Sequence, residues 1–204
     1  MSDTREKIEE APDEILELSE RCVAHVRYRL GFELDYSVDT LSVLDHFVVS
    51  VLSDEGEGEP PPPGHSRRSS ATLLLAPTVG AYFGEVLRRA FPCRWRFTSE
   101  TADKWAVEFE EVFLRINPAG VAAEAFNGEP LEGWSGAIVT APELTPIVLE
   151  RLAVAPPIPE DEFYTFAARH EALQIAEDYL RERAARYGAV GCSPDDYDRL
   201  LGSS

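Results

Sequence analysis

Residues 80–86, Gly80-Ala81-Tyr82-Phe83-Gly84-Glu85-Val86, are the most unusual stretch of the sequence. Their two glycines are four residues apart and therefore lie on one face of a helix. Each glycine costs about 1 kcal/mol relative to alanine in a helix interior, so the pair needs a compensating interaction. The simplest is close packing of another helix or a sheet against a groove that has no side chains. We therefore expect this helix to lie at the junction between the helices and the sheet.

A ligand pocket beside this groove is the alternative use of the same helix. Its candidate binding residues are Gly80, Tyr82, Gly84, Glu85, Arg88 and Arg89. Glu85 precedes the two arginines by three and four positions, which predicts either a surface ion pair or a partly buried carboxylate with a raised pKa. Because no second carboxylate stands at a fixed spacing from Glu85, we predict no catalytic residue.

Helical periodicity on the N-terminal side predicts three helices. In the first two, apolar residues recur at spacings of three and four, over residues 12–31 and 37–52. The third helix ends near Phe91. It begins either near Ala71, with a kink at Pro77, or near Ala76, with Pro77 in its first turn.

Short aromatic and β-branched segments follow this third helix and predict an antiparallel meander of about four strands. The segments are residues 94–98, 105–109, 112–117 and 121–126, separated by short polar or Pro/Gly connections. Two further helices are expected at 142–153 and 160–187. The predicted fold class is α+β, with the N-terminal helices and the glycine-bearing helix on the sheet and the C-terminal helices completing the cover.

The whole chain, residues 1–204, is expected to form a single domain. Residues 53–70 contain acidic residues and four consecutive prolines but almost no apolar residue, which predicts a disordered-type loop. We interpret this loop as an exposed insert, with a proline-rich ligand for an SH3-type groove as the alternative. The tail, residues 188–204, is expected to contribute little.

The net charge of −18 is unevenly distributed along the chain. Residues 1–68 carry −9, residues 69–126 carry −1, and residues 127–204 carry −8. Such a field repels phosphate backbones, so we predict no nucleic-acid binding. Arg88, Arg89, Arg94 and Arg96 form the one dense basic cluster. Cations are favourable near a helix C-terminus, and the alternatives are a small anion site or pairing with the acidic flanks.

Cysteines, histidines and loop motifs give no sign of a cofactor or metal. Cys22, Cys93 and Cys192 are odd in number and lack CxxC spacing, which indicates free thiols. The start of the chain is charged and does not resemble a signal peptide, and no apolar run is long enough to span a membrane. The predicted location is therefore cytoplasmic, without membrane association. The four histidines are scattered, and no phosphate-binding loop is present.

One similarity to a known family rests on several of these features. Leu44 and Asp45 precede Gly80-Ala81-Tyr82-x-Gly84-Glu85-Val86 and Arg88-Arg89, and Trp95 or Trp105 then opens strands that lead to Asn117-Pro118. Over residues 35–126 this pattern resembles an uncharacterised bacterial family with a GAYxGEV motif, a domain of unknown function. The resemblance implies no activity, cofactor or catalytic residue.

Three classes of function remain as hypotheses. The leading one is a non-catalytic protein-binding or accessory module that uses the acidic helical surfaces or the proline-rich loop, with a partner the sequence does not identify. The second is a small-molecule or anion-binding protein, including an enzyme, with its pocket near Tyr82, Glu85 and Arg88. The third is a structural homo-oligomer.

Overall fold

The computed structural model of the chain describes residues 11–55, 67–97, 99, 101–154, 159, 162–188 and 191–202. Within these residues, α-helices and a four-stranded antiparallel sheet form an α+β fold, as the sequence predicts. The helices are α1 Asp13–Leu30, α2 Leu41–Glu55, α3 Arg67–Ala90, α4 Pro118–Asn127, α5 Thr145–Ala153, α6 Phe166–Tyr187 and α7 Pro194–Leu201. Single 3₁₀ turns stand at Val38–Thr40 and Ala102–Lys104.

The sheet is a meander in which each strand pairs with the next in sequence. Its strands are β1 Cys93–Arg96, β2 Ala106–Phe109, β3 Leu114–Ile116 and β4 Val139–Thr140, in the order β1-β2-β3-β4. Successive side chains of a strand point to opposite faces. Trp95 of β1 and its partner Val107 of β2 therefore face the core, while Arg94 and its partner Glu108 lie on the outer face.

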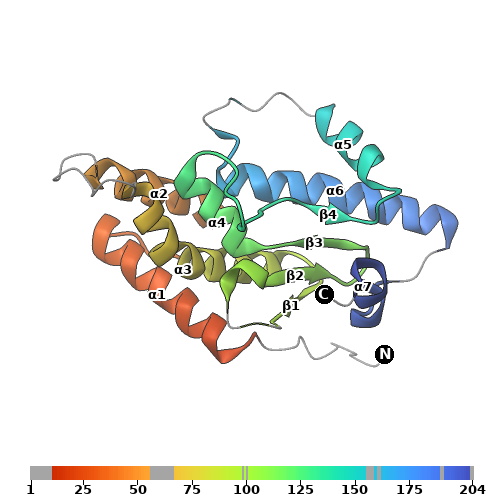
Figure 1. The fold of residues 1–204 in the computed structure, drawn as a ribbon, viewed down its shortest axis with the longest axis horizontal. Coiled ribbons are helices and arrows are strands. Elements are labelled where there is room, and N and C mark those ends of the chain that lie inside the picture. Colours follow the sequence, from red (N-terminus) through yellow and green to blue (C-terminus); the bar gives the residue numbers. More distant parts are fainter. Residues whose placement is uncertain are drawn as a thin grey trace.

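Helices cover the two faces of the sheet unequally. Figure 1 shows α3 and α6 running behind the strands, and α7 in front of them at one end. Aromatic contacts tie the covered face together, because Phe91, which follows α3, packs against Phe109 of β2 and His170 of α6. The hydrophobic core thus lies between this face and the helices, and α5 flanks α6 beyond the edge strand β4.

The prediction of a strand at 121–126 is wrong, because these residues belong to α4. The side chain of Asn117 accepts a hydrogen bond from the amide of Gly120 (3.0 Å), Pro118 occupies the first turn, and Gly128 ends the helix in a left-handed conformation. Nearly every residue of α4 is buried, so its apolar residues lie on all sides of the helix and show no helical period. The fourth strand of the sheet is β4 instead.

Helix α3 is longer than predicted, because it begins before either of the two start positions that the sequence suggests. It begins at Arg67 and continues through Pro77 to Ala90. Since α2 extends to Glu55, both ends of the predicted 53–70 loop are helical, and the rest of that loop (56–66) lies outside the described residues.

The C-terminal tail also differs from its prediction. Residues Pro194–Leu201 form α7, whose start is capped by Ser193 and Asp196 in a reciprocal capping box. Tyr197 of this helix is almost fully buried and stacks on Phe113, with ring centroids 4.4 Å apart. The tail is thus part of the packed structure.

Candidate functional site

The two glycines of α3 hold the close contacts expected from their spacing. A Cβ atom on Gly80 would lie 2.4 Å from the Cα of Ala119 in α4. A Cβ on Gly84 would lie 2.1 Å from the indole ring of Trp95 in β1. The groove between the glycines is therefore filled by a helix on one side and by the sheet on the other.

Tyr82, on the same helix, acts as a buried structural anchor. Its hydroxyl accepts a hydrogen bond from the amide of Tyr36 (2.9 Å) and is 2.7 Å from Oγ1 of Thr40. Burial raises the pKa of Tyr82 to about 12. The ring of Tyr36 stacks on that of Tyr82, and the guanidinium of Arg89 lies 3.7 Å from the centre of the Tyr36 ring. These residues fix α3 to the segment before α2.

Glu85 is fully buried, and both of its carboxylate oxygens accept hydrogen bonds. Arg88 donates to it through Nε (2.9 Å) and Nη2 (2.8 Å), and the indole N–H of Trp95 donates at 2.9 Å. Burial by itself would raise the pKa of Glu85, but the hydrogen bonds from Arg88 and Trp95 outweigh it and hold the pKa below its usual value. The hypothesis of a raised pKa is therefore wrong, and the arrangement suits a structural ion pair rather than a proton donor.

The remaining arginines of the predicted basic cluster have acidic neighbours. Arg94 lies 3.7 Å from Glu108 and 3.6 Å from Glu110, and Arg96 pairs with Asp198 of α7. Of the alternatives left open by the sequence, these contacts favour internal pairing. The predicted ligand-binding residues of α3 thus serve the packing of the fold and do not face an open groove.

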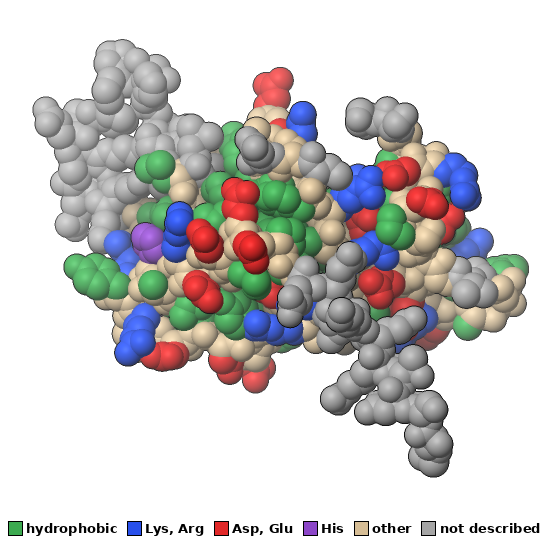
Figure 2. Space-filling model, turned by 90° about the horizontal axis from the view of Figure 1, so that it is seen from below, with side chains coloured by type: hydrophobic (Ala, Val, Ile, Leu, Met, Phe, Trp, Pro, Cys, Tyr) green, Lys and Arg blue, Asp and Glu red, His purple; other side chains and the backbone are tan. Residues whose placement is uncertain are grey.

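The acidic surplus of the chain is mixed with basic side chains on the surface. Figure 2 shows acidic and basic side chains interspersed over the described residues of the face seen from below. On this face, no large region of one sign stands out for a partner to recognise among those residues.

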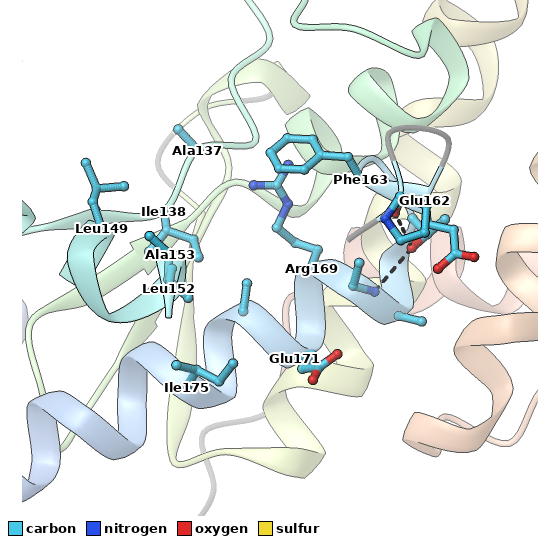
Figure 3. A pocket seen from close by; sticks show the side chains of 15 residues that line it. Ala137, Ile138, Leu149, Leu152, Ala153, Glu162, Phe163, Arg169, Glu171 and Ile175 are labelled. Carbon is cyan, nitrogen blue, oxygen red and sulfur yellow. Dashed lines mark hydrogen bonds between the residues drawn. The ribbon is translucent and has the colours of Figure 1, made fainter. Parts of the chain in front are cut away.

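A pocket of about 770 Å³ lies between α5, α6 and the segment before β4 (Figure 3). Its walls are mostly apolar, with polar groups from α6 and the residues just before it. The lining residues are Ala137, Ile138, Leu149, Leu152, Ala153, Pro159, Glu162, Phe163, Thr165, Ala167, Ala168, Arg169, Glu171, Ala172 and Ile175.

Arg169 is the most buried charged group of this pocket. Its Nη2 donates to Oε2 of Glu124 in α4 (3.0 Å), and Oε1 of Glu124 accepts from the amide of Gly136 (2.9 Å). Burial lowers the pKa of Arg169, and the carboxylate of Glu124 opposes this shift. The pair therefore fixes the guanidinium at the wall of the pocket. Figure 3 shows it rising from α6 toward Ala137 and Phe163.

Asp45 of α2 positions the helix that carries these groups. Its carboxylate accepts hydrogen bonds from the amides of Phe166 (2.6 Å) and Ala167 (3.3 Å), while the side chain of Thr165 accepts from the amide of Ala168. Free amides of a first helical turn are satisfied by such acceptors. The start of α6, and with it one wall of the pocket, is thus held by a residue 121 positions away in the sequence.

The stability conferred by Asp45 is expected to depend on pH. Burial raises the pKa of Asp45 from 3.8 to about 6, although the hydrogen bonds from the two amides act to lower it. The folded state therefore binds the proton of Asp45 more tightly than the unfolded state. Protonated Asp45 stabilises the fold fully below about pH 4, and this contribution to the free energy of unfolding is lost as the pH rises through about 6. Asp45→Asn keeps an acceptor for the Phe166 amide without the charge.

We expect the free energy of unfolding of Asp45→Asn, relative to wild type, to increase between about pH 4 and pH 7. Urea unfolding at both pH values measures this difference. Asp39→Asn, at an exposed position before α2, is the control. A difference that does not change with pH would contradict the burial of the charged carboxylate.

The sequence interpretation missed this pocket. Ala168, Ala172 and Ile175 recur at spacings of four and three, which places short side chains along one face of α6. That pattern was a readable sign of a face with room beside it. The sequence predicts a strand at Glu124, and a strand there gives no reason to expect an ion pair with Arg169.

The described residues contain neither a helix that could span a membrane nor a cluster of metal ligands. None of the helices in the described ranges is both long and apolar enough to cross a bilayer. No three His, Cys, Asp or Glu side chains among the described residues are grouped so as to hold a metal ion. No protein-family model, curated protein or solved structure matches the chain, so the resemblance to the GAYxGEV family stays a prediction.

Proposed function

We propose that the chain is a non-catalytic binding protein that takes a small, mainly apolar ligand in the pocket between α5 and α6. The observation that carries this proposal is the pocket itself, with a volume of about 770 Å³ and mostly apolar walls. Small-molecule sites in proteins are hollows of roughly 300–1,000 Å³ lined by apolar side chains and a few placed polar groups. The pocket fits this description in size and in lining.

A substitution that fills the pocket tests the proposal. Ala172 lines the pocket, and Ala172→Phe would occupy part of its volume. Gln174→Phe, at an exposed position of the same helix, adds the same ring outside the pocket and is the matched control. The probe is N-phenyl-1-naphthylamine, an uncharged fluorophore that brightens in apolar surroundings.

We expect saturable binding of about one probe per chain to the wild type and to Gln174→Phe. Ala172→Phe should weaken it by about tenfold or more, because the ring of the probe and the new ring cannot share the space. Equal binding by all three proteins, or none by the wild type, would contradict the proposal. Circular dichroism checks that each variant is folded.

A protein-binding or accessory module is the second candidate function. Leu149 and Phe163, two large apolar side chains at the pocket, are 60% and 51% exposed. Exposed apolar surface around a hollow is typical of protein-interaction sites. A partner that is captured by the wild-type chain and lost with Leu149→Ser would favour this candidate over the small ligand.

The cysteines support a reducing, cytoplasmic compartment as part of the proposal. Cys22, Cys93 and Cys192 are free thiols, and the first two are buried. Burial raises the pKa of all three, which leaves them in the unreactive protonated form. Such thiols suit a compartment in which disulfides do not form.

A further inference from the structure

Arg169 presents unused hydrogen-bond donors at the wall of the pocket. Its side chain is 13% exposed, and Nη2 is engaged by Glu124. Within the part of the chain that the structure describes, Nε and Nη1 have no acceptor. Neither nitrogen is among the fully buried polar atoms without a partner, so both are open to the pocket and available to a ligand. The wall of the pocket therefore has a place for an acceptor group.

The guanidinium is also held in a fixed orientation. Gly136 anchors one oxygen of Glu124 and Arg169 the other, so the carboxylate cannot rotate away. The ring of Phe163 lies 6.0 Å from the guanidinium carbon. A free N–H of a guanidinium that is fixed in this way binds a carboxylate oxygen through a short, charge-assisted hydrogen bond.

We propose that the ligand of this pocket is an amphipathic carboxylate, with its carboxylate on Arg169 and its apolar chain along the wall that Leu152 and Ala172 form. This inference rests on the proposed small-molecule function and specifies the ligand class. The net charge of −18 does not attract anions from a distance, so the selectivity arises from the local contacts at Arg169. An ammonium group paired with the exposed Glu162 or Glu171 is the competing arrangement.

Three ligands with the same chain and different head groups separate these arrangements. Dodecanoate, dodecanol and dodecylammonium would each displace N-phenyl-1-naphthylamine from the wild-type protein, at concentrations below micelle formation. We expect dodecanoate to bind about ten- to hundredfold more tightly than dodecanol, as for a hydrogen bond to a charged group. Equal affinities, or tighter binding of dodecylammonium, would overturn the carboxylate inference but still support a small apolar ligand. If none of the three displaces the bound probe, the carboxylate inference fails while the proposed function stands, whereas absence of probe binding contradicts the proposed function itself.

A double variant assigns the head-group preference to Arg169. Arg169→Met combined with Glu124→Gln removes both charges, so that no buried carboxylate is left unpaired. The preference for dodecanoate over dodecanol should disappear, while the affinity for dodecanol stays within about threefold of wild type. Arg151→Met, at an exposed arginine of α5, is the control and should keep the preference. A double variant that is folded by circular dichroism and still prefers dodecanoate would place the head group elsewhere.

Discussion

Replacing Gly80 by alanine is expected to lower the free energy of unfolding by about 2 kcal/mol or more. The added methyl group would lie 2.4 Å from the Cα and 2.7 Å from the amide nitrogen of Ala119. These are backbone atoms of α4, which cannot rotate aside, so α3 and α4 would have to separate. At an unconstrained helix position the same change stabilises a protein by about 1 kcal/mol, so even the sign of the effect is informative.

Urea unfolding measures this effect through the shift of the midpoint. The control is Ala185→Gly, at an exposed position inside α6, which should cost only the ordinary helix preference of about 1 kcal/mol. A Gly80→Ala protein that is more stable than wild type would show that α4 does not pack on α3 at this glycine. The role of residues 80–86 as the junction of the fold would then be wrong.

The helices with a clear period were readable from the sequence, because their pattern depends only on which face is buried. In α1, for example, Ile15, Cys22 and Val26 face the core, and Gly31 ends the helix. The same reasoning failed for Val121–Phe126 because α4 is buried on nearly all sides. Apolar residues on all sides leave no helical period, and the short segment with its β-branched and aromatic residues favoured a strand. The Asn117-Pro118 start and the Gly128 stop were visible but were interpreted as turns.

The candidate site was less predictable than the fold because it depends on contacts between distant segments. The glycine spacing predicted close packing but gave no indication of the partner, which is α4 at Gly80 and Trp95 at Gly84. The pocket depends on the relative placement of α5, α6 and residues 137–138. Local patterns do not specify which faces remain uncovered, and the ion pair of Arg169 with Glu124 joins residues 45 positions apart.

Removing the side chain of Tyr197 is expected to detach α7 from the sheet. Tyr197→Ala deletes a buried aromatic ring that stacks on Phe113, a change that typically costs about 3–5 kcal/mol. It also removes a hydroxyl that accepts from the amide of Leu114 (3.0 Å) and lies 2.8 Å from the carbonyl oxygens of Phe109 and Leu114. The hydroxyl has one proton, so it donates to one carbonyl at a time. Once the ring is gone, the Leu114 amide and the two carbonyl oxygens would need water as a hydrogen-bond partner.

Hydrogen exchange reports this detachment residue by residue. In Tyr197→Ala the amides of α7 and the Leu114 amide should exchange at least about a hundredfold faster. Those of α1, which lies towards the other end of the molecule in Figure 1, should change much less. Tyr187→Ala removes a 75% exposed ring at the end of α6 and is the matched control, with little effect expected. Unchanged exchange at Leu114 in Tyr197→Ala would mean that the hairpin between β2 and β3 holds itself together without α7. Faster exchange would instead make the last helix a structural part of the sheet's outer face, where Asp198 also pairs with Arg96.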